Sequence, residues 1–235
     1  MGMTQRPAQV IGTLALFFAG VCLVTLHVLP PPLLHTTTGA QIPYRAVNFL
    51  SEFVRTDYAP LMTACFVLLA VGAIATAATV RRILRREAVL LLIAGVALGL
   101  LAAFPTDLAD LSTDAVTCAN PLRIEPCTPI GRVHNPLSTF VFAPILLVAL
   151  SVGYRSRQES RWRNVALLAV LCGLLAVAGI VAATLYLQSV GWQGRWWTGL
   201  MQRSLVFPAL LWLAGLLRAT NPLPDVGVYS ASIGR

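Results

Sequence analysis

The chain has 235 residues, of which 57% are hydrophobic and only 11% charged, and its net charge is +8. In a typical soluble domain about a quarter of the residues are charged, and a chain of this size cannot enclose so many apolar residues in one core. The composition therefore excludes a water-soluble protein and predicts a membrane protein. The basic residues lie mostly in short stretches between apolar runs, so we attribute them to membrane topology and expect no nucleic-acid partner.

Six apolar segments are long enough to cross about 30 Å of hydrocarbon at about 1.5 Å per residue. They predict an all-α bundle of six transmembrane helices, arranged as three helical hairpins in a domain over residues 1–218. The remaining residues, 219–235, are rich in Pro, Gly and Ser and predict a flexible tail. In chain order the six segments cover residues 10–29, 58–80, 88–104, 136–154, 165–188 and 202–217.

The charged residues predict an orientation for these helices. Arginines crowd two connections, 81–86 and 155–163, which lie on the same side of a six-span protein. The positive-inside rule makes that side cytoplasmic, with both termini, and predicts a multi-pass protein of the inner cell membrane. All 17 basic residues are arginine, a bias typical of a high-GC bacterial genome. The opposite side holds most of the acidic residues, namely Glu52, Asp57, Asp107, Asp110, Asp114 and Glu125.

One short polar segment occurs twice. The segment Asn48-Phe-Leu-Ser-Glu-Phe-Val54 returns as Asn135-Pro-Leu-Ser-Thr-Phe-Val141, with five of seven positions identical, and each copy leads into an apolar run. We interpret this as an internal repeat of the hairpins. Asn followed by Pro136 is a good helix start, because Asn caps helices and Pro is tolerated at the first helical position. Helix capping and ligand binding are two equally weighted interpretations of the repeated segment.

Two cysteines, Cys118 and Cys127, lie nine residues apart in the second long outer loop. Outside the cytoplasm the environment is oxidising, so we expect a disulfide bond that closes this loop.

Polar and ionisable residues at the edges of membrane helices are costly, which makes them candidates for function. A compact bundle would bring eight of them together on the outer side. Arg203 stands out because its guanidinium stays charged and needs a carboxylate or a phosphate, with Glu52 or Asp107 as the natural partner within the chain. The eight candidate ligand-binding residues are His27, Ser51, Glu52, Asp107, His134, Ser138, Gln202 and Arg203.

The repeat also predicts where these residues meet. If the hairpins are copies, Ser51 and Ser138 lie at the outer starts of the second and fourth helices, and Arg203 lies at the start of the sixth. Helix N-termini are positive, so three of them around one pocket would favour an anionic group.

Three hypotheses for function stay open, and they differ on whether the protein is an enzyme. In the leading one, the outward polar site binds a lipid headgroup or a small amphiphile from the membrane. In the second, His27, Asp107 and His134 hold a zinc ion in an intramembrane lipid amide or ester hydrolase, and Ser51 or Ser138 supports the oxyanion. In the third, the bundle is a scaffold or accessory subunit for a membrane-protein partner. Common nucleotide-binding, hydrolase and protease motifs do not occur in the sequence.

The chain resembles the domain-of-unknown-function 998 (DUF998) family of bacterial and archaeal membrane proteins over residues 10–218. The resemblance rests on four short motifs in the same order, and it implies a six-helix membrane fold with polar positions on the outer face. That family is in turn similar to six-span proteins that include the damage-regulated autophagy modulators. The four motifs are Asn48-Phe-Leu-Ser-Glu52, Phe104-Pro-Thr-Asp107, Gly131-Arg-Val-His134 and Gln202-Arg203.

Overall fold

The computed structural model describes residues 5–35, 41–45, 48–106, 119–120, 123–124, 129–191 and 199–220. Within these ranges, six helices are long and apolar enough to cross a membrane. This confirms the predicted all-α membrane fold. The six are α1 (Gln5–Val28), α2 (Ala59–Val80), α3 (Arg85–Ala103), α4 (Pro129–Arg155), α5 (Arg163–Ser189) and α6 (Gly199–Ala219).

Short elements connect the helices. A 3-10 helix, η1 (Leu50–Arg55), precedes α2, and a second one, η2 (Ser160–Trp162), precedes α5. Two small antiparallel ribbons complete the described elements. The first pairs β1 with β2 between α1 and η1, and the second pairs β3 with β4 between α3 and α4. Their bounds are Leu33–His35, Gln41–Pro43, Ala119–Asn120 and Arg123–Ile124.

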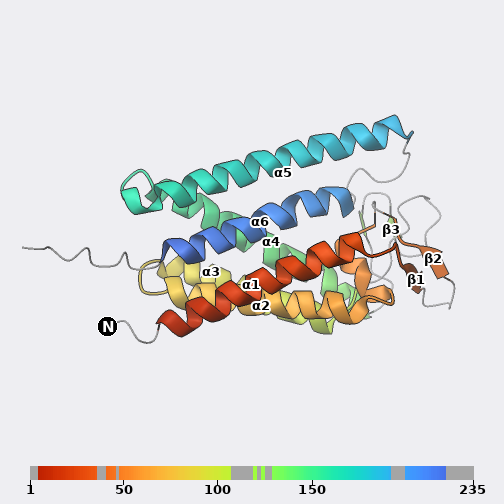
Figure 1. Cartoon of the computed structure of the whole chain (residues 1–235), viewed down its shortest axis with the longest axis horizontal. Coiled ribbons are helices and arrows are strands. Elements are labelled where there is room, and N and C mark those ends of the chain that lie inside the picture. Colours follow the sequence, from red (N-terminus) through yellow and green to blue (C-terminus); the bar gives the residue numbers. More distant parts are fainter. Residues whose placement is uncertain are drawn as a thin grey trace, which may run out of the picture.

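Successive long helices run in opposite directions, so the start of α1 and the end of α6 lie at the same end of the molecule (Figure 1). We call this the arginine end, because it also contains the connections 80–85 and 155–163. The other end, which carries the ribbons and η1, is the loop end. Helices α1 to α4 pack in chain order, whereas α6 packs on α5 and α1. The cytoplasmic location of the arginine end stays a prediction.

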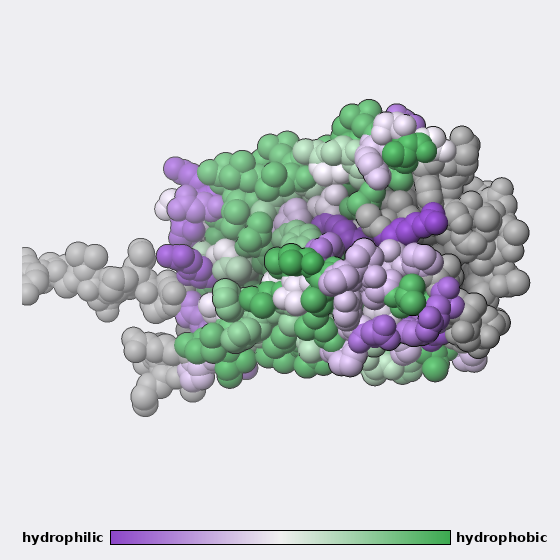
Figure 2. Space-filling view, turned by 45° about the vertical axis from the view of Figure 1, so that its right-hand side comes forward, coloured by the Kyte–Doolittle hydropathy of each residue, from purple (hydrophilic) through white to green (hydrophobic). Residues whose placement is uncertain are grey.

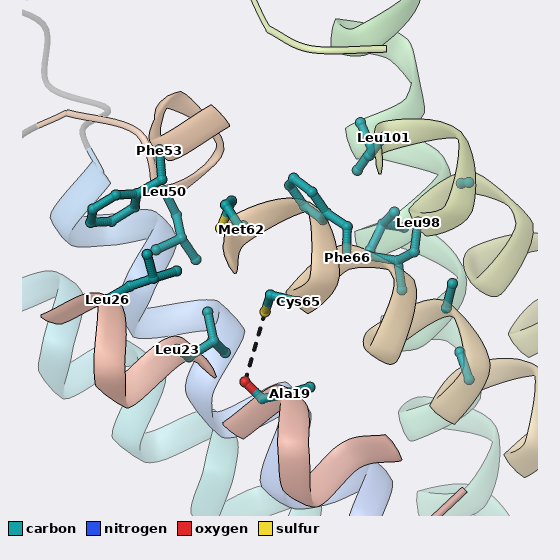
Figure 3. Packing of buried hydrophobic residues seen from close by; sticks show 14 of the residues in the cluster. Ala19, Leu23, Leu26, Leu50, Phe53, Met62, Cys65, Phe66, Leu98 and Leu101 are labelled. Carbon is teal, nitrogen blue, oxygen red and sulfur yellow. Dashed lines mark hydrogen bonds between the residues drawn. The ribbon is translucent and has the colours of Figure 1, made fainter. Parts of the chain in front are cut away.

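The core consists of two clusters of buried apolar residues, one toward each end of the bundle. In the cluster nearer the loop end, Leu50 and Phe53 of η1 lie beside Leu26 of α1 and Met62 of α2 (Figure 3). The thiol of Cys65 contacts the Ala19 carbonyl of α1 at 3.7 Å. Many large hydrophobic side chains of the long helices are exposed, as a surface in contact with lipid requires, and on the face drawn in Figure 2 they cover much of the molecule next to the arginine end.

Glycines set the closest contacts between neighbouring helices. Gly95 of α3 is buried, and a side chain there would clash with Ile74 and crowd the Ala70 carbonyl of α2. Gly179 of α5 packs in the same way on Ser204 of α6. Such small residues allow membrane helices to approach one another closely where no hydrophobic effect draws them together.

At the arginine end, Glu87 of α3 is buried with 2% of its surface exposed. Its Oε1 accepts hydrogen bonds from Ser151 at 2.5 Å and from Arg155 at 3.2 Å, both on α4. Glu159 pairs with Arg161 in the next connection. Both acidic residues therefore hold an arginine locally, and Glu87 also ties α3 to α4.

The structure corrects the predicted start of the fourth helix. We expected Asn135 to cap it with Pro136 at the first position, but α4 begins at Pro129 and Pro136 lies inside it. Proline lacks the N–H that would bond the carbonyl of residue 132, and the helix continues despite that loss. The two copies of the repeated segment also differ in local structure, since the first forms η1 and the second is part of α4. The internal repeat itself stays a prediction.

Candidate functional site

A cavity of about 670 Å³, part of it open to the surroundings, lies between α2, α3, α4, α6 and η1. This volume includes open space at the mouth of the cavity. Most of its walls are apolar, and four side chains are polar. The polar four are Ser51, His134, Ser138 and Gln202, and the apolar walls are formed mainly by Leu50, Met62, Phe66, Leu69, Leu98, Leu101, Val141, Phe142, Ile145, Val206, Ala209, Leu210 and Leu213.

The two helices α4 and α6 contribute to the cavity in the same pattern. Each lines it with five residues at positions i, i+4, i+7, i+8 and i+11, which lie on one face of a helix. On α4 this stripe begins at His134 and ends at Ile145, and on α6 it begins at Gln202 and ends at Leu213. Both helices start at the loop end (Figure 1), so the polar residues gather there and the apolar residues follow toward the middle of the bundle.

Several hydrogen-bonding groups at the polar end of the cavity have no partner within the described part of the chain. Ser51 has 8% of its surface exposed and lines the cavity, yet its hydroxyl makes no hydrogen bond within the described part of the chain, and neither does that of Ser138. The Gln202 carbonyl oxygen accepts a hydrogen bond from the Leu50 amide at 2.6 Å, which leaves its NH₂ group as a donor. His134 is 3% exposed, and its Nδ1 bonds the Phe104 carbonyl at 2.7 Å.

Glu52 organises the segment that carries Ser51. Its carboxylate is fully buried, and its Oε2 accepts hydrogen bonds from the Asn48 side chain at 2.9 Å and from the Phe49 amide at 3.1 Å. The second bond satisfies an N–H at the start of η1, where helices leave donors without partners. Phe49, not Asn48, is the residue at the cap position. The capping interpretation of Asn48 is therefore wrong, and Asn48 acts by holding Glu52.

Arg203, in the second turn of α6, connects three segments. Its Nε donates to Nε2 of His27 at 2.8 Å, its Nη1 donates to the Asn48 carbonyl at 2.9 Å, and its Nη2 donates to the Tyr44 hydroxyl. These three contacts are with neutral acceptors, and they join the end of α1 and the segment before η1 to α6. Because His27 also uses Nδ1 for the Leu23 carbonyl, at 2.6 Å, both of its ring nitrogens are engaged.

Tyr44 supports this network from the other side. Its ring stacks on Phe53 with a centroid separation of 4.2 Å, and its hydroxyl donates to the Phe49 carbonyl at 3.2 Å. Burial raises the pKa of Tyr44 to about 12, against an opposing effect of Arg203. The hydroxyl therefore stays protonated at neutral pH and can donate to a carbonyl while it accepts from the guanidinium.

The predicted site residues thus form two adjoining groups. Ser51, Ser138, Gln202 and His134 line the cavity. His27, Glu52 and Arg203 belong to the polar network beside it and are not among the lining residues, which are drawn from the described part of the chain. Whether any of these residues binds a ligand stays a prediction.

Two parts of the sequence-based site need correction. Ser138 lies nine residues after the start of α4 at Pro129, which is about 13 Å along the helix, and Ser51 lies in η1, before α2 begins. The positive ends of three helices therefore do not converge on the two serines, and the argument for an anionic ligand loses that support. The sequence analysis also missed Tyr44, which nothing but its position just before the repeated segment could have indicated.

Three predicted residues, Asp107, Cys118 and Cys127, lie outside the described residues. The predicted disulfide bond is therefore still a prediction. The described residues contain no group of three or more His, Cys, Asp or Glu side chains that could hold a metal ion. For the alternative zinc site, His27 would have to give up its contact with Arg203. His134 lines the cavity and His27 is not among the described lining residues, so the two predicted ligands lie in different parts of the site.

Comparison with protein-family models gives a match over residues 43–219, to a family described as a protein of unknown function (DUF998). The matched region begins after α1 and contains η1 and all the cavity-lining residues. Of the Arg203 network it contains Tyr44, Asn48 and Arg203, whereas His27 lies before it. No curated protein and no solved structure matches the chain.

Proposed function

Since the chain belongs to the DUF998 family of membrane proteins, whose description assigns no activity, we propose a function from the cavity itself: the protein binds one membrane amphiphile. The polar head lies at the loop end, against Ser51, Ser138 and Gln202. The apolar part extends between α4 and α6 toward the middle of the bundle.

One observation carries the proposal, namely the polarity gradient of the cavity. Two serine hydroxyls without a hydrogen-bond partner in the described residues lie at one end, and aliphatic and aromatic side chains form the rest of the walls. A hydroxyl that faces a mostly apolar cavity leaves its hydrogen-bonding capacity unused, so a ligand group that bonds it contributes free energy to binding. A molecule with one polar end and one apolar end matches both parts.

The Arg203 network supports this function indirectly. It fixes the segment before η1 against α6, and the Gln202 contact with the Leu50 amide adds a second connection. These contacts hold the backbone at the start of η1 in place, so the polar end of the cavity is formed before a ligand binds. Such preorganisation lowers the entropic cost of binding.

The test is lipid analysis of the protein purified in mild detergent, with the substitution Ser138→Phe as the variant that blocks the polar end. We expect close to one amphiphile per chain in the wild type and a large loss in Ser138→Phe. The matched control is Thr139→Phe, because Thr139 is the next residue of α4 and is exposed. A wild-type protein that is folded and free of amphiphile contradicts the proposal, as does equal occupancy in both variants.

A further inference from the structure

The cavity has a defined length, which the two stripes measure independently. From Gln202 to Leu213 on α6, and from His134 to Ile145 on α4, the lining extends over eleven residues. At about 1.5 Å per residue each stripe covers about 16 Å along its helix. Half of the hydrocarbon thickness of a bilayer is about 15 Å. The cavity is therefore about as deep as the leaflet at the loop end.

This depth limits the apolar part of the ligand. An extended alkyl chain, with carbon–carbon bonds near 1.5 Å, advances about 1.25 Å per carbon, so the cavity matches a chain of roughly 12 to 14 carbons. A shorter chain would leave wall atoms without contacts and lose dispersion energy. A longer chain would have to fold back, displace buried residues such as Leu213, which is 3% exposed, or place its end outside the cavity through the open side, where it gains no contact with the walls.

The polar end limits the head of the ligand. No charged side chain lines the cavity in the part of the chain that the structure describes, and burying a charge without a partner costs far more than burying a hydrogen-bonded neutral group. Ser51 and Ser138 can donate or accept, and the Gln202 NH₂ donates. Together they suit an ester, amide or hydroxyl group.

We propose that the ligand is a single-chain amphiphile with an uncharged, hydrogen-bonding head and an acyl chain of roughly 12 to 14 carbons, the length that fills the cavity. This inference rests on the proposed function and adds the class of ligand to it.

The experiment measures binding of monoacylglycerols, from about 8 to 18 carbons in steps of two, to the purified protein by native mass spectrometry, and we expect an optimum near 12 to 14 carbons. Ala209 lines the cavity seven residues after Gln202, which is about 10 Å along α6. The substitution Ala209→Phe therefore closes the lower part, and the optimum moves to roughly 8 carbons.

Two further variants complete the design. Ala182→Phe adds the same ring to the exposed side of α5 and should leave the optimum unchanged. Leu213→Ala removes side-chain volume at the far end of the α6 stripe and should move the optimum to longer chains, so the inference is still tested if Ala209→Phe does not fold.

The outcomes separate the inference from the proposed function. Equal binding of all chain lengths, or an optimum that neither cavity variant moves, overturns the inference while amphiphile binding stands. If a fatty acid or a lysophosphatidylglycerol binds more strongly than the monoacylglycerol of the same chain length, the inference of an uncharged head is overturned. Absence of binding by all of these ligands, together with no co-purified amphiphile, overturns the proposed function itself.

Discussion

At the scale of single residues, Asn48 joins the two charged groups of the site. Its side chain donates to the buried Glu52 carboxylate, and its backbone carbonyl accepts from Arg203. The Asn48 Oδ1 also accepts from the Arg45 amide at 2.8 Å. Asn48 thus fixes the turn before η1 and connects it to α6, a role that differs from that of a helix cap.

The geometry of the Arg203 guanidinium gives the first prediction. In Arg203→Lys the single ammonium cannot reach His27, Asn48 and Tyr44 together, because the planar fork of arginine is replaced by a point charge. Loss of one or two such charge-assisted bonds, each about 1.5–3 kcal/mol, should accelerate amide hydrogen exchange in residues 48–56 by about ten-fold or more. The exposed Arg163 provides the control, Arg163→Lys. Unchanged exchange in Arg203→Lys would show that the network does not hold the segment.

At the scale of elements, the start of α6 is shaped by contact with the segment before η1. Gly199 is the first residue of α6 and is buried, and a side chain there would overlap the Asn48 carbonyl and crowd the Arg203 guanidinium. The absence of a Cβ is therefore what allows α6 to dock so closely that Gln202 reaches the Leu50 amide.

The second prediction concerns this contact. Gly199→Ala should cost about 1–3 kcal/mol, as other overpacked sites do, and lower Tm by roughly 3–10 °C for a chain of this size. The control is Gly153→Ala in α4, where an added Cβ meets nothing within 4 Å. That change should leave Tm equal or higher, because alanine favours a helix over glycine by about 1 kcal/mol. Equal behaviour of the two variants in a thermal unfolding experiment would contradict the close docking of α6.

At the scale of the whole molecule, the distribution of arginines predicts which end faces the cytoplasm. The arginine end contains Arg81, Arg82, Arg85, Arg86, Arg155 and Arg157. The polar residues of the cavity lie toward the loop end. If the positive-inside rule holds here, the proposed amphiphile comes from the leaflet that faces away from the cytoplasm.

Cysteine labelling in whole cells tests this third prediction. In a background without native cysteines, Ser156→Cys at the arginine end should react with a membrane-impermeant maleimide only after the cells are permeabilised. Asp57→Cys, at an exposed position of the loop end, should react in intact cells. The opposite pattern would invert the topology and place the cavity in the cytoplasmic leaflet.

The sequence predicts the membrane class, the six helices and most of their bounds, because a long apolar run has no stable alternative to a helix in lipid. It did not determine the start of α4, since Asn135-Pro136 satisfies the local rules of a helix start and only the surrounding structure continues the helix back to Pro129. Local preference and tertiary context can disagree wherever a proline is tolerated inside a helix.

The composition of the site was only partly determined by the sequence. Ser51, Ser138, His134 and Gln202 could be selected as polar residues at helix ends, but which of them would share a cavity depends on how each helix is rotated about its axis. That rotation follows from packing, which turns the stripe of α4 and the stripe of α6 toward one space. The same packing brings His27 to Arg203, over a separation of 176 residues. The tertiary structure alone decided these contacts, because a side chain's direction is fixed by its neighbours in space and not by its neighbours in the chain.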